Sequence, residues 1–272
     1  MNAKYSVLMS VYYKENPVYL MKSINSILEQ TIRTNEFVIV CDGPLTDELN
    51  RLLCQYQVDY PDVIKIIRLE NNQGLGIALN TGLKYCTNEL IARMDSDDIA
   101  FPDRMEKQLL IMERENADIV SGTVVEFTEN IKNELARRSL PQEQEAIRRF
   151  ARRRNPFNHP AVMYRKECVL AAGGYKDFWL FEDYFLWLRM LSAGCTAYNI
   201  QEPVLYMRSG DAMYERRGGI RYAKQIIKFR WYMFRHGYAG LADFLVTAGG
   251  HTLVALLPNC LRKQFYERIL RK

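Results

Sequence analysis

Residues 89–98 carry the sequence ELIARMDSDD, in which a short apolar run is followed by three acids within four residues. The first six residues predict a buried β-strand, and Asp95, Asp97 and Asp98 follow it directly. Neighbouring carboxylates repel one another, so a fold tolerates them best where a cation or hydrogen-bond donors compensate the charge. Oxygen ligands of this kind suit Mg²⁺ or Mn²⁺, which also bind substrate phosphates. The alternative is a solvated acidic turn that caps the helix predicted near Pro102.

The segments around this stretch alternate between strand and helix patterns, which predicts an α/β fold. Asn16 and Thr46 are placed to cap two helices with apolar residues at i, i+3 and i+4 spacing. The predicted strands are Tyr5–Val11, Phe37–Cys41, Val63–Leu69 and Glu89–Met94. This βαβαβαβ order implies parallel strands, whose ligands lie beyond the strands' carboxyl ends. We therefore expect Asp42, which follows the second strand, to lie on the same sheet edge as Asp95–Asp98.

The second half of the chain predicts further elements and one basic helix. They are helices over Pro102–Glu115, Pro141–Arg154 and Glu182–Ala193, and a strand over Ile119–Phe127. The segment Asn155–Gly174 is rich in loop residues, and Gly194 is placed to end the last of these helices. No internal repeat is found.

Composition and charge place the chain among globular proteins with an uneven charge distribution. The 272 residues are 48% hydrophobic and 25% charged, with a net charge of +5. Residues 204–272 contain 13 Lys and Arg against 4 Asp and Glu, a net +9, which leaves −4 for the rest. We therefore predict an acidic catalytic domain over residues 1–210 and a basic helical extension over residues 211–272.

The cysteine pattern and the termini predict a cytoplasmic protein. The six cysteines are scattered singly, which suggests neither a zinc site nor a disulfide framework. The N-terminus has no signal-peptide pattern. Leu241–Leu261 is the most apolar segment, but Asp243, His251 and Pro258 interrupt it, so a contact with a membrane surface is more plausible than a span.

Other motifs put the acidic stretch in context. They are Ser6–Tyr12, Val38–Gly43, Asn72–Gly82 (NQGLGIALNTG), Met94–Arg104 (MDSDDIAFPDR), Asn158–Arg165 (NHPAVMYR), Gly173–Tyr175 and Glu182–Arg189 (EDYFLWLR). In this order they resemble the inverting family-2 glycosyltransferases of the bacterial O-antigen and capsule type. The resemblance covers residues 4–210 and implies a GT-A fold, a Rossmann-like and mostly parallel sheet flanked by helices. A single DxD motif would be weak, whereas this ordered set is specific.

The resemblance assigns a nucleotide-sugar-binding role to five residues. The Asp42 carboxylate can accept a hydrogen bond from an imide N–H, which favours uracil or thymine, and the matching family residue has that role. By resemblance, Asp95 lies beside the ribose and the metal, and Asp97 ligates the metal that bridges the diphosphate. Asp98 and Arg93 belong to the same motif, with Asp98 ranked below the other two acids. The implied Mn²⁺ or Mg²⁺ neutralises charge on the leaving diphosphate.

The resemblance also implies which residues act on the acceptor side. Asp183 matches the family's catalytic base, and Glu182 beside it is expected to orient loops or the donor sugar. The alternative for Asp183 is an acid stabilised by a helix N-terminus, an effect of up to about 1 kcal/mol. His159, Gly174 and Arg208 are expected to contact the acceptor or a diphosphate.

The basic extension contains an amphipathic helix pattern. Its cations lie within an arc of about 60° on a helix, and they are Arg217, Arg221, Lys224, Lys228 and Arg235. Another face carries Ile220, Ala223, Ile227, Trp231 and Phe234. The pattern fits either a solvated cationic face or attachment to an anionic membrane surface. No nucleic-acid-binding module is present, so no nucleic-acid partner is expected.

Together these features predict a metal-dependent enzyme on the inner face of the cell membrane. It is expected to move a hexose, glucose or galactose, from a UDP-sugar to an undecaprenyl-diphosphate-linked glycan for O-antigen, capsule or exopolysaccharide. Inversion would give a β linkage. One alternative is a sugar-phosphate nucleotidyltransferase, but Tyr12–Glu15 lacks its glycine-rich loop. The other is a non-catalytic sugar-nucleotide or membrane-binding scaffold, against which the intact acids argue.

Overall fold

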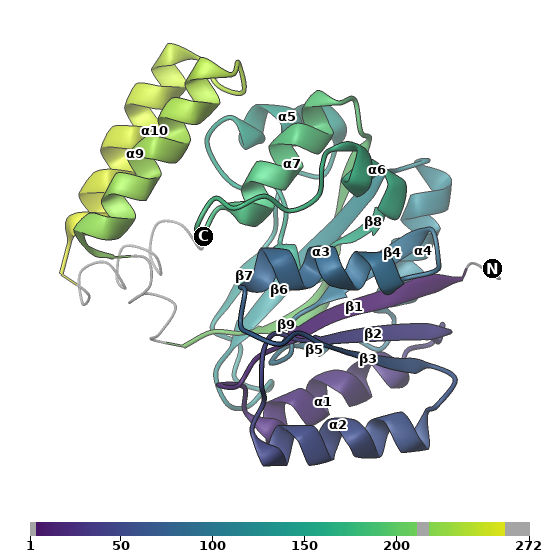
Figure 1. Cartoon of the computed structure of the whole chain (residues 1–272). Coiled ribbons are helices and arrows are strands. Elements are labelled where there is room, and N and C mark those ends of the chain that lie inside the picture. The colour runs from purple at the N-terminus through teal and green to yellow at the C-terminus, as the bar shows by residue number, and fades with distance from the viewer. Residues whose placement is uncertain (1–3, 211–217, 259–272) are drawn as a thin grey trace.

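The computed structural model describes residues 4–210 and 218–258. Within them, a mixed β-sheet is flanked by helices on both faces (Figure 1). The strands are β1 Tyr5–Val11, β2 Glu36–Cys41, β3 Ile64–Arg68, β4 Leu90–Met94, β5 Ile99–Ala100, β6 Ile119–Phe127, β7 Ala136–Arg138, β8 Met163–Arg165 and β9 Ala197–Arg208. Their order is β3-β2-β1-β4-β8-β6-β9-β5, and β7 pairs with β6.

The helices alternate with the strands in the first half of the chain and cluster in the second half. They are α1 Pro17–Leu28, α2 Asp47–Asp59, α3 Leu75–Tyr85, α4 Arg104–Arg114, α5 Gln144–Ala151, α6 Lys166–Ala171, α7 Glu182–Ser192, α9 Gly219–Arg235 and α10 Leu241–Leu256. The predicted caps are confirmed, because Asn16 Oδ1 accepts from Val18 N at 2.9 Å and Thr46 Oγ1 accepts from Leu49 N at 3.3 Å.

The first four predicted strands form the expected parallel half of the sheet. Strand β1 pairs in parallel with β2 and β4, and β2 pairs in parallel with β3. Alternate residues of β1 face opposite cores, with Val7 and Met9 on the side of α1, α2 and α4 and Leu8 on the side of α3 and α7. The carboxyl ends of β2 and β4 therefore open on the same edge of the sheet.

The other half of the sheet is mixed, which differs from the mostly parallel arrangement expected. Strand β8 lies antiparallel between β4 and β6, and β5 and β7 also pair antiparallel to their neighbours. Strand β9 runs parallel to β6. The short strand β8 lies in the segment expected to be loop, where buried Met163 and Tyr164 pair with Val120 and Ile119. Three residues are too few to show an alternating pattern in the sequence.

Helix α5 is shorter than predicted, and its end matters for the site. The sequence pattern suggested a helix over Pro141–Arg154, whereas α5 ends at Ala151. The N–H of Arg152 bonds to Arg149 O and that of Arg153 bonds to Phe150 O, which are i−3 contacts that close the last turn. Arg152, Arg153 and Arg154 consequently leave the helix and lead into the loop that carries Asn155.

Helices α9 and α10 lie side by side and form a hairpin, the C-terminal hairpin (Figure 1). Phe229 and Met233 of α9 are buried in the same core as α7. The Phe229 ring stacks on that of Phe181 with centroids 4.6 Å apart, directly before Glu182. The hairpin is thus packed against the start of α7.

The outer surface of the C-terminal hairpin is both cationic and apolar. The predicted cations Arg221, Lys224, Lys228 and Arg235 are exposed, while Arg217 and residues 259–272 lie outside the described residues. Among the apolar residues predicted to share one face of α9, Ala223 is buried, whereas several larger ones are exposed. The exposed large apolar residues of the hairpin are Ile220, Ile227 and Trp231 of α9 and Leu241, Leu245, Val246, Leu253 and Leu256 of α10. None of the helices in the described ranges combines the length and the apolar character that crossing a bilayer requires.

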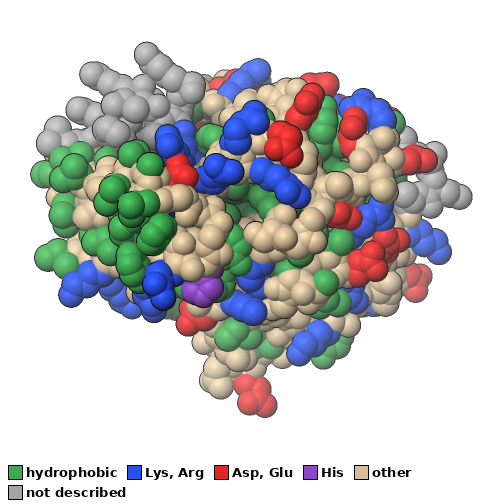
Figure 2. Space-filling view, turned by 90° about the horizontal axis from the view of Figure 1, so that it is seen from above, with side chains coloured by type: hydrophobic (Ala, Val, Ile, Leu, Met, Phe, Trp, Pro, Cys, Tyr) green, Lys and Arg blue, Asp and Glu red, His purple; other side chains and the backbone are tan. Residues whose placement is uncertain are grey.

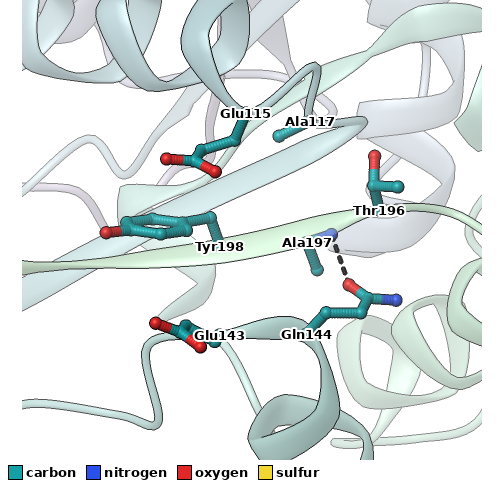
Figure 3. A pocket seen from close by; sticks show the side chains of 7 residues that line it. All are labelled: Glu115, Ala117, Glu143, Gln144, Thr196, Ala197 and Tyr198. Atoms are coloured by element: carbon teal, nitrogen blue, oxygen red, sulfur yellow. Dashed lines mark hydrogen bonds between the residues drawn. The ribbon is translucent and has the colours of Figure 1, made fainter.

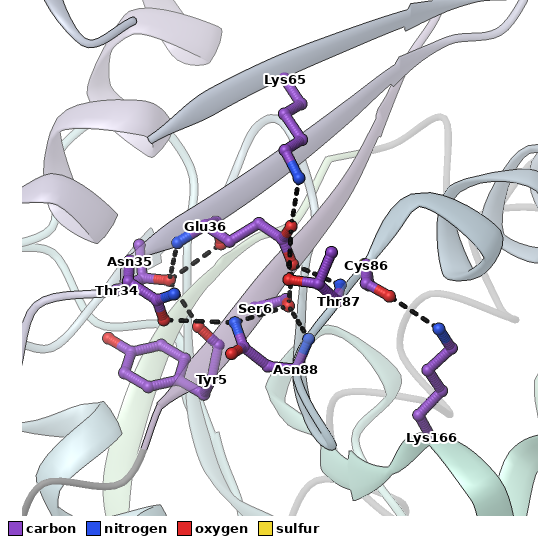
Figure 4. A network of polar contacts seen from close by, with 10 residues as sticks. All are labelled: Tyr5, Ser6, Thr34, Asn35, Glu36, Lys65, Cys86, Thr87, Asn88 and Lys166. Atoms are coloured by element: carbon purple, nitrogen blue, oxygen red, sulfur yellow. Dashed lines mark hydrogen bonds and ion pairs between the residues drawn. The ribbon is translucent and has the colours of Figure 1, made fainter. Parts of the chain in front are cut away.

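A polar network joins the N-terminal ends of β1 and β2, opposite the ends that lead to Asp42 and Asp95–Asp98 (Figure 4). Buried Glu36 bonds to Ser6, to Lys65 Nζ at 2.5 Å and to the backbone N–H of Thr87 at 2.7 Å. Burial alone would raise the pKa of Glu36, but these donors outweigh burial and lower the pKa to about 2. The network ties the starts of three neighbouring strands and the α3–β4 loop together.

Candidate active site

Asp42, at the end of β2, holds the glycine-rich loop that leads into α3. Its Oδ1 accepts from Gln73 N at 2.8 Å, and its Oδ2 accepts from Gly74 N at 3.0 Å. Gly43 has a φ of +84°, and a Cβ there would lie 2.5 Å from Asn72 N, so only glycine fits this close approach. Each carboxylate oxygen of Asp42 has a further lone pair, so the predicted contact to a nucleobase stays compatible with this geometry.

The three acids after β4 converge as the sequence predicts. One carboxylate oxygen from each of Asp95, Asp97 and Asp98 lies within 4.8 Å of the others. Asp98, which sequence reasoning ranked lowest, is the most buried: its Oδ1 accepts from Arg208 N at 2.7 Å, and its Oδ2 has no hydrogen-bond partner in the described structure. Asp95 pairs with Arg93. Asp98 Oδ2 is therefore a buried hydrogen-bond acceptor without a described donor, in a cluster with two other acids.

The protonation behaviour of this cluster reflects uncompensated negative charge. Burial, together with Asp95 and Glu15, raises the pKa of Asp97 to about 7. Burial and the neighbouring Asp97 raise the pKa of Asp98 well above its ordinary value. A divalent cation would reverse both shifts, and an all-oxygen donor set suits Mg²⁺ or Mn²⁺.

Arg93 interacts electrostatically with both groups of acids. Its side chain is buried, and its Nε and Nη1 have no hydrogen-bond partners among the residues described. Its positive charge lowers the pKa values of Asp98, Glu182 and Asp183. The guanidinium of Arg104 holds the Arg93 carbonyl at 2.6 Å, which fixes the end of β4. Arg93 is thus a buried cation whose Nε and Nη1 can still donate hydrogen bonds to a ligand.

Arg208 lies at the acidic cluster. Besides the bond to Asp98, its Nε donates to Asp97 O at 3.1 Å. Its guanidinium lies over the ring of Tyr19 at 3.6 Å and over that of Phe127 at 4.5 Å. Of the three residues predicted to contact the acceptor or a diphosphate, Arg208 therefore lies with the predicted metal ligands.

Helix α7 begins with Glu182 and Asp183, and a residue outside this helix also binds Asp183. Asp183 Oδ1 accepts from Tyr184 N at 2.7 Å, and its Oδ2 accepts from Asn155 Nδ2 at 2.6 Å. Burial raises the pKa of Asp183, and burial together with Asp183 raises the pKa of Glu182 to about 7. A carboxylate with a raised pKa is a stronger proton acceptor than an ordinary aspartate. Sequence reasoning missed Asn155, whose only signal is its position next to the arginines after α5.

His159 and Gly174 meet around Tyr175. His159 Nε2 lies 3.1 Å from Tyr175 OH, and burial lowers the pKa of His159 well below its ordinary value, so the ring is neutral. Gly174 has a φ of +64°, and a Cβ there would lie 2.6 Å from Asn80 Oδ1. Asn80 accepts from Tyr175 N at 2.8 Å and donates to Tyr175 O at 2.7 Å. This α3 residue, which sequence reasoning did not single out, fixes the turn.

A pocket of about 300 Å³ lies away from these acids, at the start of β9 (Figure 3). It is lined by Glu115, Glu143 and Tyr198 among others, and Gln144 Oε1 accepts from Ala197 N beside it at 2.6 Å. None of the predicted site residues lines it. We therefore assign the chemistry to the acids on the sheet edge.

Cys168 and Cys195, which the sequence spacing did not connect, lie close to Asp118. Ligand atoms of the three residues lie within 4.8 Å of one another. The Asp118 carboxylate already accepts from Thr196 N at 2.8 Å and lies 3.6 Å from Arg165 Nε. These contacts account for Asp118 without a metal.

Comparisons with known proteins agree with this fold. Among solved structures, the mannosyltransferase PcManGT from Pyrobaculum calidifontis, in complex with GDP-Man and Mn²⁺, has a TM-score of 0.67 at 19% identity. The match covers 96% of this chain and 78% of that one. The fold is therefore that of the GT-A glycosyltransferases.

Sequence relatives assign the family. Residues 6–171 match the glycosyl transferase family 2. A relative from Escherichia coli, "UDP-Gal:alpha-D-GlcNAc-diphosphoundecaprenol beta-1,3-galactosyltransferase", is 38% identical over 271 residues, which cover 99% of this chain and 97% of that protein. The amylovoran biosynthesis glycosyltransferase AmsE of Erwinia amylovora is 38% identical over 269 residues, with coverages of 97% and 98%. The chain belongs to glycosyl transferase family 2, and it is a glycosyltransferase.

Proposed function

We propose that the protein transfers a hexose from a UDP-sugar to a hydroxyl of a sugar carried on undecaprenyl diphosphate, with inversion. The observation that carries this proposal is that one buried cation, Arg93, pairs with Asp95 and also interacts electrostatically with Asp98 and Asp183, members of two separate acid groups. One group suits a metal-bound diphosphate and the other suits a proton acceptor. The E. coli relative, whose name describes such a reaction, supports galactose over glucose as the hexose and a polysaccharide pathway as the context.

The proposed reaction is a single displacement. The acceptor hydroxyl gives its proton to Asp183 as its oxygen attacks the anomeric carbon. The bond from that carbon to the diphosphate oxygen breaks, and UDP leaves with the electron pair. Attack from the face opposite the leaving group converts an α-linked donor into a β-linked product. Asn155 binds Asp183 Oδ2 and the backbone N–H of Tyr184 binds Oδ1, and the two bonds together fix the carboxylate plane.

Asp95, Asp97 and Asp98 would hold Mn²⁺ or Mg²⁺. The partnerless Oδ2 of Asp98 and the raised pKa values of Asp97 and Asp98 fit a cation at this place. The metal, when bound, supplies positive charge against the leaving diphosphate. Arg93, with two unpaired nitrogens, is proposed to donate to the donor sugar or its phosphate, and Asp42 to the recognition of the uracil imide.

We also propose that the C-terminal hairpin attaches the enzyme to the cytoplasmic face of an anionic membrane. Its exposed cations and exposed apolar side chains support this proposal, since cationic residues are drawn to anionic lipids and apolar ones enter the headgroup boundary. Figure 2 shows hydrophobic side chains gathered over the hairpin, bordered by Lys and Arg. A lipid-linked acceptor would then reach the site without leaving the membrane.

The test is a panel of UDP-sugars against a synthetic prenyl-diphosphate-linked N-acetylglucosamine, with Mn²⁺ or Mg²⁺, followed by NMR of the product. We expect transfer from UDP-galactose and a β linkage. Transfer with retention of configuration, or no transfer from any UDP-sugar, contradicts the proposed function. The same panel with GDP-mannose serves as the control for the nucleotide assignment.

A further inference from the structure

A run of cations follows α5 directly beside the proposed catalytic base. It consists of Arg152, Arg153 and Arg154, termed here the arginine run. We infer that the arginine run, with Arg230 behind it, binds the diphosphate of the lipid-linked acceptor, an inference that rests on the proposed function. It defines a second anion site, separate from the metal-dependent site for the donor diphosphate.

The arginine run is connected to the base by a single residue. Asn155, which donates to Asp183 Oδ2 at 2.6 Å, is the next residue after Arg154. Consecutive Cα atoms are about 3.8 Å apart, so the side chain of Arg154 starts next to the group that holds the base. In a hexopyranose, the reacting hydroxyl and the anomeric oxygen lie across one ring. A sugar with its hydroxyl at Asp183 therefore carries its diphosphate about one sugar ring away from the base.

The backbone of the arginine run is fixed from two helices. Tyr184 OH of α7 donates to Ala151 O at 2.7 Å. Arg230 of α9 donates to Arg153 O at 2.8 Å through Nη2 and to Tyr184 OH at 3.1 Å through Nη1. The run is thus held rigidly relative to the base, which is what precise positioning of a substrate anion requires.

Arg230 contributes a buried positive charge whose hydrogen-bond partners in the described residues are neutral. Its side chain is buried, its two terminal nitrogens donate to neutral oxygens, and its Nε has no hydrogen-bond partner in the described part of the chain. The ring of His251 lies 3.3 Å from Nη2. A buried cation without a carboxylate partner is costly, and an anion bound nearby lowers that cost. This is independent of the exposed charges of Arg152 and Arg153.

The order of features on this face matches the order of groups in the acceptor. A series of contacts leads from Asp183 through Asn155 to the arginine run and from there to the C-terminal hairpin, to which Arg153 is tied by an ion pair with Asp243 at 2.5 Å. Figure 2 shows Lys and Arg side chains between the centre of this face and the hydrophobic side chains of the hairpin. A sugar, a diphosphate and a lipid chain follow one another in the same sequence. Arginine suits the middle position because its planar fork binds phosphate oxygens in pairs.

The first test distinguishes weaker binding of the acceptor diphosphate from a general loss of acceptor binding. We compare KM for prenyl-diphosphate-linked N-acetylglucosamine with KM for an uncharged alkyl N-acetylglucosaminide, using Arg152→Ala/Arg154→Ala. The KM for the diphosphate acceptor should rise about tenfold or more, as expected for lost charge-assisted bonds, and far more than the KM for the alkyl glycoside. The charge-preserving pair Arg152→Lys/Arg154→Lys should recover part of the loss.

The matched control is Arg33→Ala/Arg51→Ala, which removes two exposed arginines beside β2 and in α2. It should leave the ratio of the two KM values as in the wild type. An equal rise for both acceptors in the Arg152/Arg154 variant, or the same change in the control, overturns the inference.

A binding measurement keeps the inference testable without turnover. Calorimetry with geranyl diphosphate, in the presence of saturating UDP and Mg²⁺, should show saturable binding to the wild type and weakened binding to Arg152→Ala/Arg154→Ala. Equal binding by both proteins, or none by the wild type, overturns the inference. If this binding behaves as expected while the panel of UDP-sugars gives no transfer, the proposed reaction fails and the anion site stands.

Discussion

At the scale of single residues, the proposed mechanism depends on the Asp183 carboxylate. Asp183→Asn keeps the size of the side chain but removes its ability to take a proton. We expect kcat to fall about 10²- to 10⁴-fold, with the dissociation constant for UDP unchanged. Transfer assays and calorimetry check this. Wild-type kcat in the variant would mean that the base lies elsewhere.

The raised pKa values of the same pair predict a pH dependence. Asp183 must be ionised to accept a proton, and its pKa lies above the ordinary value of 3.8, so kcat/KM should fall as pH falls through that raised pKa. Asn155→Ala removes a hydrogen-bond donor that lowers the pKa of Asp183, so that pKa should rise further. The acid limb should therefore move to higher pH in this variant. Glu167→Gln, an exposed change in α6, should leave the profile unchanged, and an unmoved limb in Asn155→Ala would contradict the assignment of the limb to Asp183.

The acidic cluster predicts a metal requirement that single substitutions alter. Asp97→Asn removes one charged oxygen of the proposed site, so stimulation by Mn²⁺ should be lost and half-saturation should need at least tenfold more metal. Asp103→Asn, a change of the same type at a half-buried acid that pairs with Lys107, is the control. Full activity of Asp97→Asn in the presence of a chelator would refute the metal assignment.

At the scale of elements, the Glu36 network predicts how stability depends on pH. Glu36 has a folded pKa of about 2, below its ordinary 4.5, so its stabilising contribution is present above pH 4.5 and is lost as pH falls towards 2. Glu36→Gln should lower the free energy of unfolding by about 1–3 kcal/mol at pH 7. In urea titrations, the difference from the wild type should shrink between pH 5 and pH 2. Exposed Glu29→Gln should cause no comparable change.

Elements differ in how far the sequence determines them. Asn16, Thr46 and the first four strands follow from local signals, capping and apolar runs, which act within a few residues. The direction of β8 depends on pairing with β4 and β6, partners 43 or more residues away along the chain, such as Val120 for Met163. Long-range pairing leaves no local pattern, and this explains why the sheet was expected to be mostly parallel.

The same distinction applies to the site. The convergence of Asp95, Asp97 and Asp98 follows from their spacing after one strand. The bond from Asn155 to Asp183 and the clamp of Asn80 on Tyr175 join loops to helices far along the chain, so sequence reasoning did not find them. The bond from Arg208 to Asp98 was not found from the sequence for the same reason, since only the fold brings β9 against Asp98.

At the scale of the whole molecule, the exposed apolar surface of the C-terminal hairpin predicts membrane binding. Leu245→Glu/Leu253→Glu places two charges on the exposed surface of α10, where these side chains are 61% and 70% exposed. Sedimentation with vesicles that contain phosphatidylglycerol should decrease strongly, because burying a charge in the headgroup boundary is unfavourable. Val58→Glu/Leu135→Glu, at exposed apolar positions outside the hairpin, should sediment like the wild type. Unchanged sedimentation of the hairpin variant would contradict the proposed attachment.

The packing of α9 on α7 also has a thermodynamic consequence. Phe229 stacks on Phe181, directly before Glu182, and Arg230 donates to Tyr184, directly after Asp183. If membrane contact shifts α9, it must change the free energy of the base's surroundings. Linkage is reciprocal, so an acceptor bound at Asp183 would change the affinity of the hairpin for lipid by the same factor. If acceptor binding raises the affinity for lipid, the enzyme would remain on the membrane longer with substrate bound than without it. Its residence time on the membrane would then depend on whether the active site is occupied.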